Sequence, residues 1–138
     1  MRNLHLRIWL FAGIIASIVL VSAHCTQSPY IQGEILYSNF CESCHMQDGS
    51  GLGAEIPPLA GADYIAQNQE KLACMIRHGI AEPLVVNGIT YNQAMPGVEV
   101  LSDVEITNII NYVNQAWGNN HGTVTLGEVR KQLEACRH

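Results

Sequence analysis

The chain has 138 residues, a length that fits one domain, and it carries 12 Asp and Glu against 7 Lys and Arg, for a formal net charge of −5. Loss of the first 23 residues would remove two basic residues and no acidic ones, which leaves a net charge of −7. An acidic chain is a poor electrostatic match for nucleic acid or for an anionic membrane surface. We therefore expect neither as a partner.

Residues 1–23 have the parts of a secretory signal peptide. Two arginines precede an apolar run that begins at Ile8, and Val-Ser-Ala at 21–23 supplies small residues for cleavage. The apolar run through Ala23 has 16 residues, fewer than the roughly 20 that cross the hydrocarbon core, so an uncleaved membrane anchor is the alternative. The sequence predicts an extracytoplasmic, periplasmic protein, with a short linker at 24–30.

The first helix of the mature chain is predicted from about Tyr30 to Cys44. Gly33, Leu36, Tyr37 and Phe40 recur at helical spacing and form one apolar stripe. A glycine on that stripe costs helix stability, about 1 kcal/mol against alanine, so we expect it to let another helix approach closely.

Residues 41–45 form the pentapeptide CESCH at the end of this helix. Cys41 and Cys44 would lie about one turn apart, so both can bond to the vinyl groups of one haem while His45 presents its imidazole to the iron. A CxxC disulfide and half of a zinc site are the alternatives, but zinc would need a second ligand pair at suitable spacing, which the sequence lacks. The motif predicts one covalent haem c, with Cys41 and Cys44 as attachment points and His45 as an iron ligand.

The middle of the chain is predicted to hold two helices and a hairpin. A short helix is expected at 63–66, and a longer one from Asn68 as N-cap to His78, with Gly79 as its stop. The Asn-Gly pair at 87–88 stands between two β-branched runs, a pattern typical of a tight hairpin.

Met95 is the candidate for the second axial ligand of the haem iron. It precedes a Pro-Gly pair in an expected loop, where no helical stripe would hide it. A thioether in this position favours reduced iron and blocks exogenous ligands. The competing ligands are His78 and His121, which would make a bis-histidine site, whereas Met75 is expected in a helix core.

Two further helices are predicted, each opened by a capping box. The first starts at Ser102, with Glu105 three residues on, and carries an apolar stripe that ends with Trp117 near Gly118; we expect Tyr112 and this helix to pack on the Gly33 face. The second starts at Thr125 and runs to about Cys136. Basic residues in this terminal helix are expected to complement the helix dipole.

Several stretches together resemble a class I bacterial cytochrome c, a monohaem electron-transfer protein. They are Gly33 and Tyr37 ahead of 41–45, then Pro-Pro-Leu-Ala-Gly at 57–61, then 91–97 with Met95-Pro96-Gly97, and last 102–119 with Tyr112 and Trp117-Gly118-Asn119. The resemblance implies an all-α cytochrome c fold at 31–119, a small helical domain wrapped around one covalent haem, followed by a short helical extension at 120–138. It also implies His45 and Met95 as axial ligands, with the Pro57 carbonyl accepting a hydrogen bond from the His45 ring.

The function implied is one-electron transfer between extracytoplasmic or membrane-bound redox proteins, such as an oxidase or a reductase, without an enzymatic activity of its own. A haem-binding subunit that passes electrons into a larger oxidoreductase has the same haem chemistry and is the main alternative. A small haem peroxidase or sensor is the other, and it would need distal polar groups that the neighbours of Met95 do not supply.

Three cysteines are left over: Cys25, Cys74 and Cys136. In an oxidising compartment an odd number means that at least one is free, modified or paired between chains. Lipidation of Cys25 would tether the protein to a membrane, although Val-Ser-Ala at 21–23 also suits ordinary cleavage. Cys74 and Cys136 would then form a disulfide closing a loop of about 60 residues, worth roughly 4 kcal/mol, or remain a buried thiol and a terminal thiol.

Overall fold

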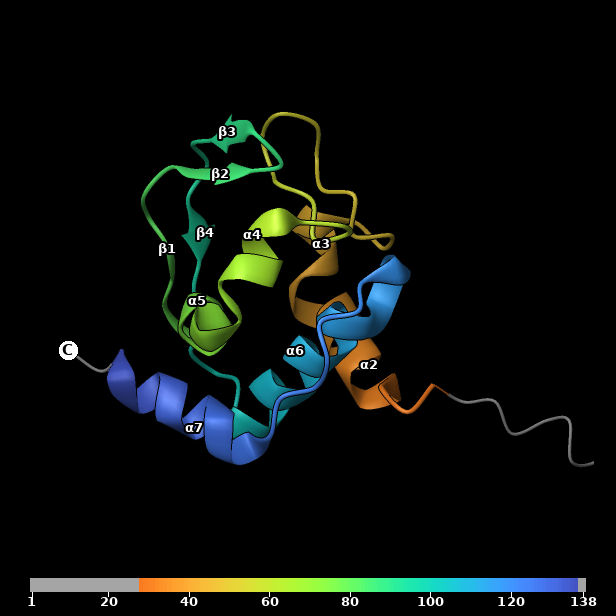
Figure 1. Ribbon diagram of the computed structural model, residues 1–138, viewed down its shortest axis with the longest axis vertical. Coiled ribbons are helices and arrows are strands. Elements are labelled where there is room, and N and C mark those ends of the chain that lie inside the picture. Colours follow the sequence, from red (N-terminus) through yellow and green to blue (C-terminus); the bar gives the residue numbers. More distant parts are fainter. Residues whose placement is uncertain (1–27, 137–138) are drawn as a thin grey trace, which may run out of the picture.

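Two long helices from opposite ends of the domain cross and support the rest of the fold. The computed structural model describes residues 28–136, in which α2 (Ile31–Phe40) packs against α6 (Asp103–Gln115) (Figure 1). A Cβ atom added at Gly33 would lie 2.6 Å from Tyr112 Cβ and would also collide with the Asn108 carbonyl oxygen. The expected close approach at Gly33, with Tyr112 at the crossing, is therefore confirmed.

The predicted continuous helix from Tyr30 to Cys44 is wrong in one respect, because the chain breaks at Cys41. Helix α2 ends at Phe40, Cys41 has φ −121° and ψ −35°, and a single turn, α3 (Glu42–His45), follows. Phe40 is 41% exposed, so the apolar stripe does not remain buried to the end of the helix. The last four residues of the CESCH pentapeptide thus form a helical turn that is separate from α2.

The middle helices are α4 (Asp63–Gln67), the 3₁₀ turn η1 (Gln69–Lys71) and α5 (Leu72–His78). Asn68 has the predicted N-cap position, ahead of η1, but its side chain makes no capping hydrogen bond. Its side-chain amide donates instead to the Tyr64 carbonyl, 2.9 Å away, in α4. Gly79 does stop α5, as predicted, with φ +80°.

Four short strands interrupt the helices. β1 (Gly79–Ile80) pairs antiparallel with β4 (Met95–Pro96), and β2 (Leu84–Val86) pairs with β3 (Ile89–Tyr91). The β2–β3 turn has positive φ at both central residues, +51° and +78°, which only an Asn-Gly type of pair adopts readily, and it confirms the predicted hairpin. Because no strand exceeds three residues, the fold is the small helical one that was expected.

Helix α6 begins with the predicted capping box but ends earlier than expected. The Glu105 amide donates to the Ser102 hydroxyl at 3.3 Å, and the Ser102 amide donates to the Glu105 carboxylate at 2.7 Å. The helix stops at Gln115, and Trp117 lies in the short turn η2 (Ala116–Gly118) with φ +55°. Trp117 is therefore not the last residue of the α6 stripe.

The terminal helix α7 (Leu126–Ala135) also opens with its predicted capping box and packs on α5 and α6. Its buried residues are Val129 and Leu133. Arg130 is not in the last turn of α7, so the predicted complementation of the helix dipole is wrong for this residue. Its guanidinium lies 3.6 Å from the Asp103 carboxylate of α6 instead.

Cys74 and Cys136 form a disulfide, with Cα atoms 6.1 Å apart, that joins α5 to the end of α7. Of the alternatives left open by the sequence, the structure therefore has the bridge. The predicted signal peptide, Cys25 and Arg137 lie outside the described residues. Between residues 28 and 136, no helix has the length and apolarity that crossing a membrane requires.

Candidate haem site

An apolar cavity of about 400 Å³ lies between α3, α5, α6 and the β1–β4 pair. Its walls carry Cys41, Cys44 and His45 from the pentapeptide together with Met95 from β4. The rest of the lining is mostly aliphatic or aromatic and comes from α4, α5, α6, the strands and the prolines after α3: Tyr37, Ile56, Pro57, Pro58, Leu59, Ala62, Tyr64, Ile65, Leu72, Met75, Ile76, Ile80, Leu84, Val86, Ala94, Pro96, Ile109, Ile110 and Val113. The size and the apolar lining of this cavity suit a large, flat, hydrophobic group.

His45 is held in one tautomer on its side of the cavity. Its Nδ1–H donates to the Pro57 carbonyl oxygen, 3.1 Å away, because a carbonyl can only accept. Burial lowers the pKa of His45, while the bond to Pro57 opposes part of that shift. The ring is therefore neutral near pH 7, and its lone pair is on Nε2, the form in which imidazole binds a metal.

The loop after α3 carries Pro57 to this position. The Gly51 amide donates to the His45 carbonyl at 3.1 Å, and a Cβ at Gly51, where φ is +71°, would lie 2.7 Å from the Pro57 carbonyl carbon. Only glycine lets the two backbone stretches pass this closely in this conformation. The turn-rich segment thus sets the distance between Pro57 and His45.

Met95 reaches the cavity from a strand, whereas the sequence predicted a loop. Ile80 and Gly79 of β1 stand opposite Met95 and Pro96, and the Val98 amide donates to the Ile76 carbonyl of α5 at 2.8 Å. Backbone hydrogen bonds therefore hold the segment on both sides of Met95.

The two thiols of the pentapeptide differ in exposure: Cys44 is exposed and Cys41 half-buried. Burial, and secondarily the neighbouring Cys44, raises the pKa of the Cys41 thiol to about 11. A thiol that stays protonated is a poor zinc ligand. Within residues 28–136, moreover, no three His, Cys, Asp or Glu side chains gather as a metal cluster.

His78 and His121, the competing ligands, are not among the described residues that line the cavity. His78 is exposed at the end of α5, and His121 lies after η2, where its backbone amide donates to the Asn114 carbonyl. Met75 packs against the hydrophobic core, as expected, and it also lines the cavity.

Asn119 and Tyr37 are structural residues whose roles the sequence did not reveal. The buried Asn119 side chain accepts from Gly61 N at 2.8 Å and donates to the carbonyls of Leu59 and Val113. The Tyr37 hydroxyl donates to the Met46 carbonyl at 2.6 Å, next to His45. Both tie the loop after α3 to α2 or α6, and their partners lie too far along the chain for a local pattern to indicate them.

Tyr37, Tyr112 and Trp117 form an aromatic cluster beside the cavity. Their ring centroids are 5.0 to 5.5 Å apart, in tilted and edge-to-face arrangements. The Trp117 indole donates to the Gln47 carbonyl at 3.0 Å. The unusual φ of Trp117 thus places the ring between α2 and the loop that follows α3.

The donor set and the cavity fit a haem attached through two thioethers, so the fold and the site define a c-type cytochrome. A family model described as cytochrome c oxidase, cbb3-type, subunit III matches residues 29–113, and the chain belongs to this family. The expected fold class is thereby confirmed. The chain binds one covalent haem c, which confirms the cofactor that the pentapeptide predicted.

Curated relatives include both small cytochromes and subunits of larger enzymes. The chain is 35% identical over 83 residues to cytochrome c-552 of Thermus thermophilus, covering 57% of this chain and 63% of that protein. It is 36% identical over 102 residues to the cytochrome c subunit of alcohol dehydrogenase (quinone) of Gluconobacter oxydans, covering 72% of this chain and 21% of that subunit. It is 31% identical over 117 residues to the fructose dehydrogenase cytochrome subunit of Gluconobacter japonicus, covering 82% and 24%.

This chain thus spans about a fifth to a quarter of the dehydrogenase subunits and less than two thirds of the small cytochrome. This chain shares the cytochrome c domain with the family and with these relatives. The function of the domain is electron transfer.

Proposed function

We propose that the protein is a monohaem one-electron carrier, in which Cys41 and Cys44 attach the haem and His45 and Met95 ligate its iron. The observation that carries the proposal is the convergence of these four side chains on one apolar cavity, three from α2–α3 and one from β4. When bound, the haem supplies one-electron chemistry by cycling between ferrous and ferric iron.

The protein's residues hold the ligands in fixed positions and keep water away from the iron. His45 is oriented by Pro57 and presents a neutral nitrogen, and Met95 is oriented by its strand. Together with the His45 imidazole, the Met95 thioether would hold the iron, favour its ferrous state and block other ligands. Ligation that does not change with oxidation state suits rapid electron exchange.

The cavity lining favours a carrier over a peroxidase or a sensor. The lining residues next to Met95 in the chain are Gln93, Ala94 and Pro96, of which only Gln93 has a side chain that can donate a hydrogen bond. The described lining residues include no Arg or Lys and no histidine other than His45. Peroxide activation needs distal hydrogen-bond donors and an open iron position.

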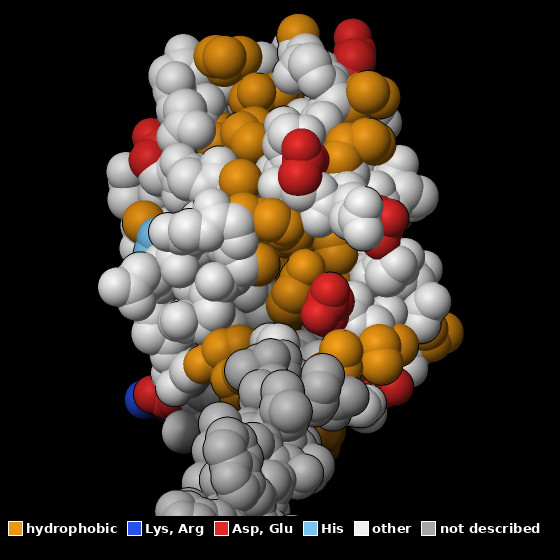
Figure 2. Space-filling model, turned by 90° about the vertical axis from the view of Figure 1, so that its right-hand side faces the viewer, with side chains coloured by type: hydrophobic (Ala, Val, Ile, Leu, Met, Phe, Trp, Pro, Cys, Tyr) orange, Lys and Arg blue, Asp and Glu red, His pale blue; other side chains and the backbone are white. Residues whose placement is uncertain are grey.

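The proposed partners are extracytoplasmic redox proteins at a membrane. A signal peptide at 1–23 would export the protein to their compartment, and lipidation of Cys25 would tether it to the membrane beside them. The face shown in Figure 2 has a band of hydrophobic side chains with scattered acidic ones and very little Lys or Arg. With the net charge of −5, such a surface repels acidic partners and favours basic ones.

Two variants at Met95 test the ligation. Met95→His should keep the iron six-coordinate and low-spin but lower the reduction potential, because imidazole stabilises ferric iron more than a thioether does. Met95→Ala should open the iron to cyanide and carbon monoxide. If potentiometry shows no downward shift of the reduction potential in Met95→His, the ligand is another residue. If mass spectrometry finds the tryptic peptide that holds Cys41 and Cys44 without the added mass of haem, the proposed attachment is refuted.

A second candidate function is that of a haem subunit within a dehydrogenase complex, which the alcohol and fructose dehydrogenase relatives favour. Native purification in mild detergent separates the two. A complex would copurify with a dehydrogenase and show haem reduction on addition of an alcohol or a sugar. A free carrier would elute alone as a small monomer that such compounds do not reduce.

A further inference from the structure

Helix α5 lies between the cavity and the terminal helix α7. Leu72, Met75 and Ile76 of α5 line the cavity, while Ala73 and Cys74 are bonded to α7. No residue of α7 lines the cavity. Any influence of α7 on the haem iron must therefore pass through α5 or α6, the two cavity-lining helices on which α7 packs, and α5 is the one to which α7 is covalently joined.

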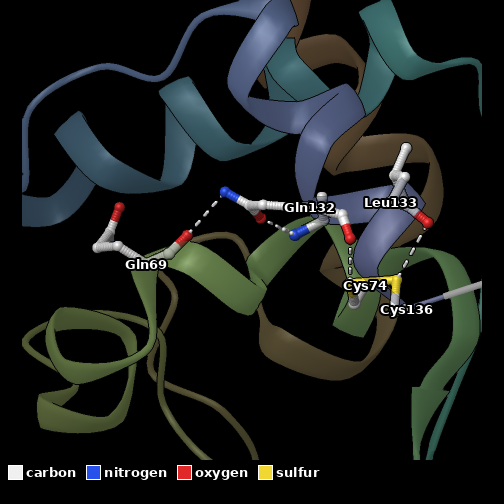
Figure 3. The surroundings of a disulfide bond; sticks show 6 residues. Gln69, Cys74, Gln132, Leu133 and Cys136 are labelled. Atoms are coloured by element: carbon white, nitrogen blue, oxygen red, sulfur yellow. Dashed lines mark hydrogen bonds between the residues drawn. A yellow bond between two sulfur atoms is a disulfide. The ribbon is translucent and has the colours of Figure 1, made fainter.

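Helix α7 is joined to α5 by a disulfide and one hydrogen bond, and to the preceding turn η1 by a second hydrogen bond (Figure 3). The disulfide joins Cys74 to Cys136. The Gln132 side-chain oxygen accepts from the Ala73 amide at 3.0 Å, and its NH₂ group donates to the Gln69 carbonyl at 3.1 Å. Gln132 thus provides hydrogen-bond partners for a free backbone amide in the first turn of α5 and for a free backbone carbonyl of η1. The N-cap residue of α5 makes no such side-chain hydrogen bond.

Helix α5 in turn holds the segment that carries Met95. The Arg77 guanidinium donates to the Glu99 carbonyl at 2.9 Å, and Ile76 O accepts from Val98 N. A Cβ at Gly97 would lie 2.6 Å from the His78 carbonyl carbon, so the two backbones are in direct contact. A shift of α5 would therefore move the Met95 segment.

We propose that α7 is a clamp on α5 whose role is to fix Met95 on the iron, with Gln132 as a positioning residue and the Cys74–Cys136 disulfide as its lock. The match to the family model ends at residue 113, ahead of α7, so the clamp is additional to the matched domain. The proposal rests on Met95 being the axial ligand.

Opening the clamp should weaken the Met95 side and spare the His45 side. His45 and Pro57 are joined by the loop that follows α3, which has no bond to α5 or α7 among the described residues. Helix α5 has only seven residues, and a helix this short depends on its packing partners. Local opening of α5 would let Met95 leave the iron without global unfolding.

The test uses the full-length holoprotein, with Cys74→Ser combined with Cys136→Ser, and separately Gln132→Ala, which keeps the disulfide. Three readouts apply to the ferric protein: the methionine–iron charge-transfer band, the rate of cyanide binding and the reduction potential. In the cysteine variant we expect a weaker band, a lower potential and cyanide binding about tenfold faster, the size of a typical coupling between sites. Gln132→Ala should shift each readout in the same direction but less.

Glu134→Gln is the matched control, since Glu134 is exposed on the same helix and makes no bond to α5 in the described structure. Gln132→Glu keeps the acceptor for Ala73 but loses the donor to Gln69, and should fall between wild type and Gln132→Ala.

A lower melting temperature with all three iron readouts unchanged in the cysteine variant and in Gln132→Ala would overturn the clamp. If the cysteine variant does not fold, Gln132→Ala decides alone. Met95→Ala separates the two proposals. If Met95→Ala abolishes the band and the clamp variants leave it intact, only the clamp fails; if the band survives Met95→Ala, both proposals fail.

Discussion

The two sides of the haem cavity are built in different ways. On the His45 side, the attachment thiols, the histidine and Pro57 all lie within residues 41–57, joined by one loop. On the Met95 side, the ligand strand depends on β1, on α5 and, through the disulfide, on α7, which is some forty residues farther along the chain. The His45 side is built from one stretch of chain, whose loop is also bonded to Trp117 and Asn119. The Met95 side is bonded to β1 and α5 and, through α5, to α7.

This difference teaches that the His45 side and the Met95 side of the cavity have separate mechanical supports. A local loop closes with little entropic cost and stays formed while distant elements loosen. A strand held by several distant elements moves whenever one of them does. The Met95 side is therefore expected to be the first to yield, and variants can strain one side at a time.

Removal of the attachment chemistry should have the largest effect. Cys41→Ser combined with Cys44→Ser leaves His45 and Met95 in place but removes both thioether sites. We expect haem that extracts into acidified organic solvent, and loss of most bound haem in cells. Pyridine haemochrome spectra and intact mass check this, and retention of covalent haem in the variant would contradict the assignment.

Gly51→Ala should strain the His45 side. Its Cβ would lie 2.7 Å from the Pro57 carbonyl carbon at a φ of +71°, so we expect a loss of about 2 kcal/mol of stability. Displacement of the Pro57 carbonyl weakens its bond to His45, lowers the basicity of the ring and raises the reduction potential.

Gly53→Ala is the matched control for Gly51→Ala, because Gly53 has φ +54° but nothing within 4 Å of an added Cβ. It should share the backbone strain and leave the potential unchanged. Equal potentials in the two variants would mean that Pro57 does not tune His45.

Gly97→Ala should strain the Met95 side instead. The added Cβ would meet the His78 carbonyl carbon at 2.6 Å, without backbone strain from positive φ, so we expect a loss of about 1 kcal/mol or somewhat more. The methionine–iron band should weaken while the haem stays attached. Gly127→Ala, whose Cβ would meet only the Thr125 hydroxyl at 3.9 Å, is the control, and a band equally weak in both would refute the separate supports.

The smallest effect is expected from the capping boxes, which open α6 and α7. The hydrogen bonds from the Ser102 amide and hydroxyl hold the pKa of Glu105 below its ordinary value, and Thr125 does the same for Glu128. The unfolded chain therefore binds more protons in mildly acidic solution, and this contribution is lost as the pH falls from the ordinary glutamate pKa through the lowered one. Glu105→Gln combined with Glu128→Gln should make the melting temperature fall less steeply over that range; an unchanged slope would contradict the assigned role.

Local signals in the sequence predicted several features correctly. The capping boxes at Ser102 and Thr125, the hairpin at 87–88 and the stop at Gly79 were all found, since each depends on the few residues that make it. The pentapeptide likewise predicted the covalent haem c, because its residues are contiguous.

Other features were missed or left open because their causes lie far away in the chain. Trp117 continued the helical spacing, yet it leaves the helix to pack on Tyr37.

The sequence by itself determined the class of protein, the covalent haem and the boundaries of most helices, because contiguous residues and local hydrogen bonds carry that information. Only the tertiary structure decided that Met95 stands on a strand, that Cys74 meets Cys136, and that α5 lies between the cavity and α7. These features depend on which distant segments pack together, and that follows from the burial of apolar surface over the whole chain, which no local pattern encodes.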